Sequence, residues 1–449
     1  MNGINELADR IVGLRTDGVA SAIMAKLRLH VADTVGAWVA ATQTAEGKAL
    51  ISFRRRPPIG HAGDRNLYDD LAAHCALVRL SEIDDIHLAS MTTPGSIAIP
   101  AAVTLAANLH DTEIDSVVAA MLAGYEAMIR LGLVIKGPSI LYRGIWPTYF
   151  TAGFAAAAVT ARLLRLDQEQ TAHALALALT LASPSVGQHH AVTTARWFSV
   201  GNAARNGLTA ALAAQSGFTA DLDILRSRLL PEVYGIEPDI AAMVGNTALA
   251  FSEVSMKPWC AARQTMAATQ ALREILESGV RAAEISEIAV YVLPPHLKMI
   301  DHGITPGDRT SFLTSLPYQL AIVALQPSHR ADLNLAAEVP LSSLHSFMGR
   351  VKVAAEDALL ADYPARWPAR IVVEAPSGRR ELRVDCVPGD PARPLTKAEV
   401  ENKFNHFAEP LGSDTTAKLL QSSLNTLHSN DSLFSLMGDL EDVMSRAAR

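Results

Sequence analysis

Apolar residues recur at intervals of three and four positions through most of the first 245 residues. This spacing predicts amphipathic helices rather than strands. The segments that carry it are Ala20–Ala41, Leu71–Leu80, Ile97–Leu109, Ile114–Leu131, Ala152–Leu164, Asp167–Leu181, Gly201–Ser216 and Thr219–Leu230. Asp167 and Gln170 stand three residues apart at the start of one segment, as in a capping box, and Pro184 is expected to end the same helix. The many alanines and glycines among these helices favour close packing of their axes.

The pattern changes after about residue 253. Residues 284–295 alternate apolar and polar positions before two prolines, which predicts a strand. Residues 369–387 hold two such runs on either side of Ser377 and Gly378, which predicts a β-hairpin. Helical spacing persists at Lys257–Ser278, Tyr318–Ala324 and Leu344–Ala354, and it returns in the last fifty residues. We therefore expect a mainly α protein with a large all-helical domain at 1–254, a smaller α+β domain at 255–405, and helices of 406–449 that return to the first domain.

Composition narrows the class of protein. The chain has 449 residues, of which 49 % are hydrophobic and 19 % charged, so a disordered or fibrous protein is excluded. The formal net charge of −7 gives no basic surface for nucleic acid or an anionic membrane. Cys75, Cys260 and Cys386 are far apart and form no CxxC motif, which indicates free thiols rather than a disulfide framework. No signal peptide is recognisable and no apolar run looks long enough to span a bilayer, so we expect a cytoplasmic protein.

Familiar cofactor motifs are missing from the sequence. It has no GxGxxG after a predicted strand, no GxxxxGK[ST], no GxSxG and no HExxH. His189 and His190 are adjacent, so in a helix they would point about 100° apart and make a poor metal pair. We therefore expect neither a metal ion nor an organic cofactor.

Four segments in a fixed order carry a resemblance to a known family. They are SEIDDIHLASMTTPGSIAIPAAVTLA (81–106), LYRGIWPTYFTAGFAAAAVTARLL (141–164), TTARWFSVGNAARNGLTAALAAQSGFTA (193–220) and KPWCAARQTMAATQALREI (257–275), followed by SLPY (315–318). Together they resemble the MmgE/PrpD family, which includes 2-methylcitrate dehydratase and cis-aconitate decarboxylase. The resemblance covers nearly the whole chain. It implies an all-helical domain with a smaller α+β domain, a homodimer, and a small polycarboxylate substrate.

The chain departs from the dehydratase and decarboxylase members at positions that carry their chemistry. The resemblance places a histidine of those members at Thr93, Trp146 and Met266, a lysine at Ala195, and a threonine at Ile86, while the first acidic residue of the motif is Glu82. Dehydration needs an acid that protonates the departing hydroxyl, and the histidine positions supply none here. Epimerisation at a carbon next to a carboxylate needs only a base on each face and cations that stabilise the enolate-like charge. The pattern therefore resembles the family's iminodisuccinate epimerase. A hydro-lyase acting on a citrate-type acid and an inactive polycarboxylate-binding relative stay open.

The candidate residues follow from this resemblance and from their chemistry. Lys257, Tyr149 and His87 are the candidate proton-transfer groups, because lysine, tyrosine and histidine can each serve as a base or an acid. Arginines and tyrosines next to family-site positions are the candidate carboxylate ligands: Arg143, Arg196, Arg263, Tyr318 and Tyr142. Asp84 and Asp85 are expected to orient an arginine or a histidine, or to cap a helix. A structural role, such as a buried hydrogen bond or a helix cap, is favoured for Tyr149, Tyr142, Asp84 and Asp85. For Lys257, His87 and the three arginines a structural role, such as an ion pair, is about equally compatible with the sequence.

Overall fold

A computed structural model describes residues 3–56, 66–109, 112–183, 193–245, 248–326, 333 and 339–448. The chain folds into two compact units. Of the described residues, one unit contains those up to Met256 together with those from Thr396 onward, and the other contains those of Lys257–Leu395. His189, His190 and Pro184 lie outside the described residues.

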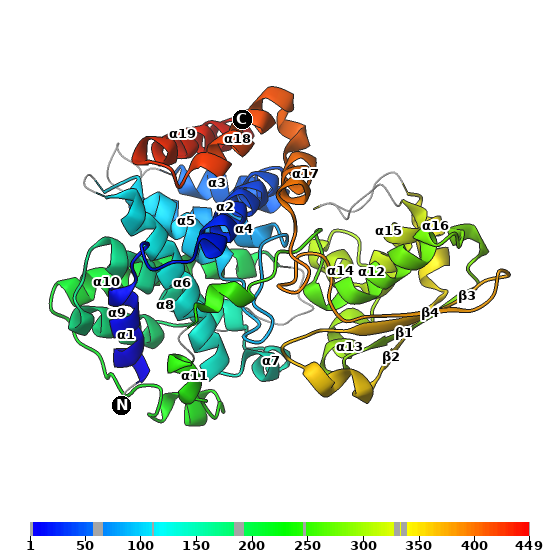
Figure 1. The fold of residues 1–449 in the computed structure, drawn as a ribbon, viewed down its shortest axis with the longest axis horizontal. Coiled ribbons are helices and arrows are strands. Elements are labelled where there is room, and N and C mark those ends of the chain that lie inside the picture. The colour runs from blue at the N-terminus through cyan, green and yellow to red at the C-terminus, as the bar shows by residue number, and fades with distance from the viewer. Residues whose placement is uncertain are drawn as a thin grey trace. The chain divides into compact units, whose positions relative to one another are not determined.

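In the described part of the first unit every regular element is a helix (Figure 1). Its α-helices are α1 (Gly3–Gly13), α2 (Ser21–Ala41), α3 (Ala45–Arg54), α4 (Leu67–Leu80), α5 (Gly95–Ala106), α6 (Ile114–Val134), α7 (Gly137–Ile140), α8 (Pro147–Leu163), α9 (Gln168–Thr180), α10 (Ala195–Gln215), α11 (Ala241–Val244), α17 (Lys397–Ala408), α18 (Ser413–Asn425) and α19 (Asn430–Ala447). The predicted capping box is confirmed, because Asp167 accepts from the backbone N–H of Gln170 and the Gln170 side chain accepts from that of Asp167.

Close contact between helices holds this unit together. Helix α10 packs against α8, and a Cβ atom added at Gly207 would lie 2.3 Å from the carbonyl oxygen of Gly153. Only glycine allows these two backbones to approach so closely. The apolar helix α6 packs against α5 and α8. Among the described residues it is the one helix long and apolar enough to cross a membrane, but 94 % of its most apolar window is buried among its neighbours.

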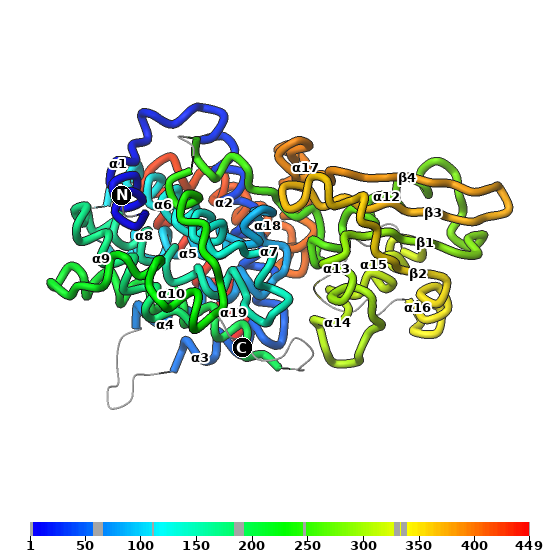
Figure 2. Tube along the Cα trace, turned by 90° about the horizontal axis from the view of Figure 1, so that it is seen from below, coloured from blue at the N-terminus to red at the C-terminus, as the bar shows by residue number. Residues whose placement is uncertain are grey.

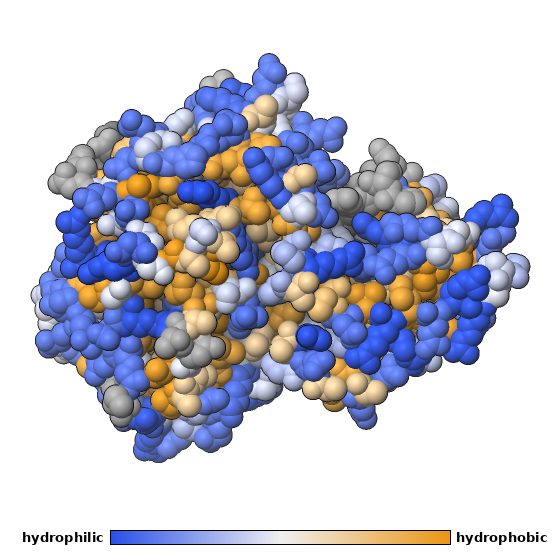
Figure 3. All heavy atoms as spheres, in the orientation of Figure 1, coloured by the Kyte–Doolittle hydropathy of each residue, from blue (hydrophilic) through white to orange (hydrophobic). Residues whose placement is uncertain are grey.

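The ends of the chain meet in the helical unit. Helices α17 and α18 pack on α2, and α19 contacts α3 and α5 (Figures 1 and 2). This pairing brings residues more than 350 positions apart in the sequence into contact, as in the ion pair of Lys403 with Asp33. On the face shown in Figure 3, hydrophilic residues cover much of this unit, and apolar residues show between them.

The second unit has the expected α+β composition. Its strands are β1 (Glu287–Val292), β2 (Val351–Ala355), β3 (Ala369–Glu374) and β4 (Arg380–Val384), in the order β2-β1-β3-β4. Its helices are α12 (Arg263–Glu277), α13 (Pro294–Ile300), α14 (Arg309–Thr314), α15 (Leu316–Leu325) and α16 (Leu341–Met348). The predicted hairpin is confirmed, with β3 antiparallel to β4, whereas β1 pairs with β2 in parallel. Helix α12 packs on β3 and β4.

Three of the predicted helices are wrong in whole or in part. Residues 219–228 form turns, because Asp221 accepts from the backbone N–H of Asp223 and so competes with helix formation. The helix expected at Leu344–Ala354 ends at Met348, since the residues from Val351 join the sheet as β2. The helix expected from Lys257 begins at Arg263.

Candidate active site

The segment that joins α4 to α5 contributes several buried polar side chains to the helical unit. Ile86 exchanges two backbone hydrogen bonds with Ser255, and the backbone N–H of His87 donates to the carbonyl of Thr92. Glu82 and Met91 lie in the left-handed backbone region, with φ of 59° and 55°. Such a conformation costs about 1 kcal/mol for a residue other than glycine and persists only when the surroundings impose it. The segment 81–94 is therefore held in one defined shape.

Asp85 is the anchor of this segment. One carboxylate oxygen, Oδ2, accepts from the Tyr125 hydroxyl at 2.7 Å and lies 3.0 Å from Nδ1 of His30. The other, Oδ1, accepts from the backbone N–H of Gly95 at 2.8 Å, at the start of α5. A carboxylate at a helix N-terminus is favoured by the free N–H groups and the helix dipole. Asp85 thus contacts both a histidine and a helix N-terminus, which are the two kinds of partner considered for it from the sequence.

Lys26 lies near this carboxylate and was missed by the sequence analysis. Its ammonium donates to the carbonyl oxygens of Phe251, Ser252 and Val254 at 3.2, 2.7 and 2.8 Å. Burial lowers the pKa of Lys26 to about 8, although the nearby Asp85 raises it. Burial likewise lowers the pKa of His30. A signal was present in the sequence, because Lys26 and His30 are four residues apart and so share one face of α2.

His87 is a buried, neutral imidazole. Its Nδ1 accepts from the backbone N–H of Ser90 at 3.2 Å, and only 6 % of the residue is exposed. Burial, followed by the charge of Lys26, lowers the pKa of His87 to about 4. Because a backbone N–H can only donate, the single proton of the neutral ring is on Nε2. At neutral pH this side chain can donate a hydrogen bond through Nε2, but it cannot be an imidazolium acid.

An arginine–aromatic cluster lies around the start of α8 and α10. The Arg196 guanidinium carbon is 4.3 Å from the ring centroid of Trp146 and 4.9 Å from that of Trp197. Tyr149 packs edge-to-face on Trp146, with ring centroids 5.8 Å apart. Burial raises the pKa of the Tyr149 hydroxyl, while the charges of Arg196 and Arg79 lower it. The hydroxyl therefore stays protonated beside two guanidinium groups.

Arg79, at the end of α4, completes this cluster and was not singled out from the sequence. It forms ion pairs with Glu82 at 3.0 Å and with Asp84 at 3.1 Å. Its guanidinium carbon lies 5.9 Å from the ring centroid of Trp197. Asp84 therefore orients an arginine, whereas its neighbour Asp85 faces His30. We define Arg79, Tyr149, Trp146, Arg196 and Trp197 as the arginine–tyrosine cluster.

Two positions where the resemblance places histidines in relatives have other roles in this unit. Trp146 supplies the ring against which Arg196 stacks. Thr93 is part of a hydroxyl group network: its N–H donates to Oγ1 of Thr148 at 3.1 Å, and its own Oγ1 is 3.3 Å from Oγ of Ser96. Neither side chain can deliver a proton near neutral pH.

Two further candidates of the helical unit have different surroundings. Arg143 is exposed and donates to the backbone carbonyls of Tyr234 and Gly235 at 2.7 and 3.0 Å. Tyr142 is half-buried in the short 3-10 helix Leu141–Arg143. Arg143 is thus bound to the backbone at residues 234–235, whereas Arg196 stacks on Trp146 and Trp197.

The remaining candidates belong to the α+β unit. Arg263 opens α12 and pairs in a bidentate manner with the Asp390 carboxylate, with distances of 2.8 and 2.7 Å from Nη2. Tyr318 lies in the first turn of α15, where its N–H donates to the capping Ser315 hydroxyl at 3.3 Å. Lys257 is the first residue of this unit. Its role as a base stays a prediction from the sequence.

No group of three or more histidine, cysteine, aspartate or glutamate side chains is placed to hold a metal ion in the described part of the chain. Cys75 and Cys260 are buried, and Cys386 is half-buried. Burial raises the pKa of the Cys75 thiol. This cysteine is therefore a protonated core residue and no nucleophile.

Comparison with known proteins identifies relatives of both units. The MmgE/PrpD N-terminal domain matches residues 5–229, and the MmgE/PrpD C-terminal domain matches residues 259–427. A cis-aconitate decarboxylase of Aspergillus terreus is 28 % identical over 236 residues, which are 49 % of this chain and 47 % of the relative. A cis-aconitate decarboxylase-like protein of Aspergillus oryzae is 30 % identical over 149 residues, or 32 % of this chain and 31 % of that protein. The matched segments thus span about half the length of these curated relatives, or less.

Proposed function

Because this chain belongs to the MmgE/PrpD family, we propose that it is an enzyme acting on a small polycarboxylate, and specifically a cofactor-independent epimerase of iminodisuccinate. The observation that carries the proposal is the arginine–tyrosine cluster, which brings the Arg196 guanidinium and a protonated hydroxyl together, with Arg79 beside them in its ion pairs with Glu82 and Asp84. The names of the relatives support an acidic substrate with several carboxylates. The absence of an acidic side chain at Thr93 and Trp146 supports proton exchange over the expulsion of a leaving group.

The reaction requires one proton to leave Cα and another to return on the opposite face. When the Cα–H bond breaks, its electron pair moves into the adjacent carboxylate, which becomes an enolate-like dianion. Arg196 is suited to bind that carboxylate, because a stacked guanidinium keeps its donors in a fixed plane. A cation preorganised at the developing charge lowers the barrier most effectively where water is excluded. No electron is gained or lost in the cycle, so no redox cofactor is needed.

Tyr149 is suited to return the proton. Its hydroxyl is protonated at neutral pH, and the two guanidinium groups would stabilise the tyrosinate that is left behind. The neutral His87 carries its proton on Nε2, and its Nδ1 already accepts a hydrogen bond. It could act as a base only if the ring proton first moved to Nδ1, which would leave Nε2 free to accept a proton. A role as base for Lys257 stays a prediction from the sequence. Carboxylate-binding roles for Arg143, Arg263, Tyr318 and Tyr142, a homodimer and a cytoplasmic location stay predictions.

The names of the relatives favour a second candidate, a lyase such as a decarboxylase of a cis-aconitate-like acid. Loss of carbon dioxide also leaves a carbanion next to a carboxylate, and a proton must then be added to that carbon. The same arginine and tyrosine could serve that step. A hydro-lyase and a protein that binds without catalysis remain as further alternatives.

The two reactions are separated by proton NMR of the purified full chain in D₂O with EDTA. The stereoisomers of iminodisuccinate are incubated in one sample and cis-aconitate in another. Interconversion of stereoisomers with deuterium at Cα supports the epimerase. Loss of cis-aconitate with formation of an unsaturated diacid supports the decarboxylase instead, and no change in either sample contradicts both.

A further inference from the structure

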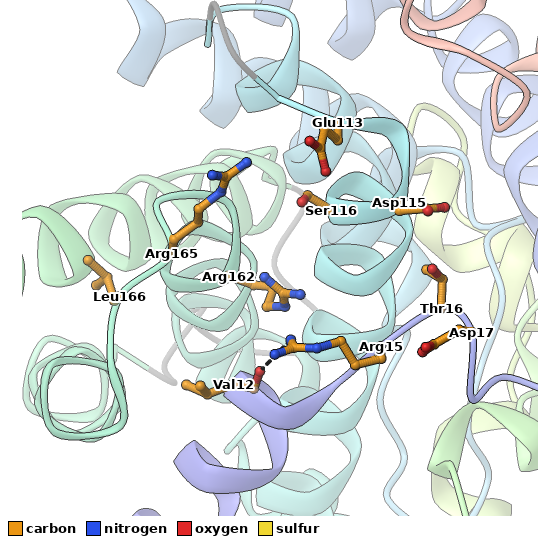
Figure 4. Close-up of a pocket in the computed structure, with 10 residues that line it drawn as sticks. All are labelled: Val12, Arg15, Thr16, Asp17, Glu113, Asp115, Ser116, Arg162, Arg165 and Leu166. Atoms are coloured by element: carbon orange, nitrogen blue, oxygen red, sulfur yellow. Dashed lines mark hydrogen bonds between the residues drawn. The ribbon is translucent and has the colours of Figure 1, made fainter.

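A polar pocket lies in the helical unit, formed by residues other than those of the arginine–tyrosine cluster. It has a volume of about 580 Å³ and lies between the loop after α1, the first turn of α6 and the end of α8 (Figure 4). Pockets that bind small molecules usually span about 300–1,000 Å³. The volume is therefore sufficient for a metabolite-sized ligand.

Three arginines gather in this pocket. Figure 4 shows Arg162 between Arg165 and Arg15, with Ser116 of α6 above it. Burial, followed by the nearby charges of Arg15 and Arg165, lowers the pKa of Arg162. Like charges at short distance are unfavourable unless an anion lies between them. An anion bound among the three guanidinium groups would relieve their repulsion, because none of them forms an ion pair with the carboxylates of Asp17, Glu113 and Asp115 that also line the pocket.

The hydrogen bonds of these arginines leave donors available. Arg162 donates from Nη2 to the carbonyl of Leu14 at 3.1 Å, while its buried Nε has no hydrogen-bond partner. Arg15 donates only to the neutral carbonyls of Val12 and Leu14. None of the three forms an ion pair with a carboxylate of the described residues. A buried guanidinium donor without an acceptor is uncommon in a folded protein and indicates a missing partner.

The first turn of α6 adds to the attraction for an anion. Glu113 is the N-cap residue of this 21-residue helix, and Ser116 follows within the first turn. The free N–H groups at such an end favour a negatively charged group. The carboxylates of Asp17, Glu113 and Asp115 also line the pocket and, like Arg15 and Arg165, belong to exposed residues whose charges solvent screens. Arg162 is only half-buried, but its charge is screened less than those of its neighbours.

We propose that this pocket is a second binding site, separate from the arginine–tyrosine cluster, for a small metabolite that carries a carboxylate or a phosphate group. Arg162 is its central ligand, and Arg165 and Arg15 bind from either side. Guanidinium groups recognise both kinds of oxyanion through paired N–H donors. The carboxylates of Asp17, Glu113 and Asp115 in the pocket wall repel a highly charged anion, so we expect a ligand of low negative charge. The proposal does not depend on which reaction the protein catalyses.

Isothermal titration calorimetry of the full chain with citrate, inorganic phosphate and aspartate tests the proposal. To remove binding at the other site, the titrations are made in an Arg196→Gln background. We expect at least one of the three anions to bind with one-to-one stoichiometry. We also expect Arg165→Gln, added to that background, to weaken binding at least tenfold. Arg228→Gln, at an exposed arginine of the same unit outside the pocket, should leave it unchanged.

The outcomes distinguish the two kinds of oxyanion and the alternatives to this site. Binding of phosphate alone identifies a phosphate ligand, and binding of citrate or aspartate alone identifies a carboxylate ligand. The proposal is overturned if citrate, phosphate and aspartate all fail to bind at about 10 mM. It is also overturned if one of them binds and Arg165→Gln leaves its affinity unchanged. Arg162→Gln serves as a second variant, with far-ultraviolet circular dichroism as the check that it folds.

Discussion

At the scale of single residues, Arg196 is the side chain on which the proposed chemistry depends most. It is held between two indole rings, so its guanidinium can offer a fixed pair of donors to a carboxylate. We expect Arg196→Gln to raise KM for the substrate about 10- to 100-fold, as for the loss of a charged hydrogen bond worth about 1.5–3 kcal/mol. Arg196→Lys should not restore it, because an ammonium group cannot stack or bind in a bidentate manner. Initial rates over a range of substrate concentrations provide the measurement.

Arg205 gives a matched control on the same helix. It pairs with Asp69 at 3.2 Å, with 42 % of its side chain exposed. Arg205→Gln should keep the KM of the native protein within twofold. An unchanged KM in Arg196→Gln would show that this arginine has only a structural role.

His87 is expected to make stability depend on pH. Its pKa is about 4 in the folded protein and about 6.5 when unfolded. Between these values the unfolded chain binds the additional proton, so the free energy of unfolding falls as pH decreases from 6.5 to 4. The full shift corresponds to roughly 3 kcal/mol. Urea unfolding at a series of pH values should show a smaller loss over this range for His87→Asn than for the native protein.

A partly buried histidine provides the control for this measurement. Nδ1 of His173 also accepts a backbone N–H, from Ala220 at 3.2 Å, but this residue is only partly buried. His173→Asn therefore removes a similar hydrogen bond without removing a deeply buried imidazole. If His87→Asn and His173→Asn change the pH dependence equally, burial of His87 is not its cause.

At the scale of elements, the contact between Asp85 and the N-terminus of α5 fixes the segment 81–94. A Cβ atom added at Gly95 would lie 2.5 Å from Oδ2 of Asp85, closer than any real contact of this type. We expect Gly95→Ala to lower the free energy of unfolding by about 1–3 kcal/mol, as other overpacking substitutions do. Gly438, inside α19, has nothing within 4 Å of an added Cβ. Gly438→Ala should instead stabilise the protein by about 0.5–1 kcal/mol, through helix propensity.

Urea unfolding of both variants measures these opposite effects. Equal stabilisation by the two substitutions would mean that the carboxylate moves aside easily and does not fix the segment. In that case the Gly95→Ala variant should also keep its catalytic rate.

Elements were predictable from sequence where local chemistry alone determines them. The capping box at Asp167 and the hairpin around Gly378 depend on neighbouring residues, and both are confirmed. The β2 strand was read as helix because its parallel partner β1 is about sixty residues away. The candidate site was likewise predictable only where neighbouring residues determine it. Asp85 was identified from its motif, but its partners His30 and Tyr125 could not be, because they lie on two helices distant in sequence.

At the scale of the whole molecule, one buried ion pair connects the last part of the chain to the first. Lys403 of α17 lies 2.6 Å from the Asp33 carboxylate of α2 and also donates to the carbonyl of Ile83 at 2.9 Å. Only 3 % of Lys403 is exposed. Burial raises the pKa of Asp33, while the charge of Lys403 lowers it. The lysine therefore compensates the charge of a buried carboxylate and, through its hydrogen bond to Ile83, also holds the start of the segment 81–94.

Removal of this lysine should destabilise the helical unit far more than removal of an exposed one. Lys403→Met leaves Asp33 without its ion-pair partner, and we expect the free energy of unfolding to fall by about 3–5 kcal/mol. The double variant Lys403→Met with Asp33→Asn should recover a large part of that loss, because no charge then stays buried. Lys418→Met removes a lysine whose side chain is 65 % exposed from its pair with Asp439, to which the Ser422 hydroxyl also donates, and should cost less than about 1 kcal/mol. Urea unfolding followed by circular dichroism measures all three, and a double variant less stable than Lys403→Met would show that the lost charge compensation is not the cause.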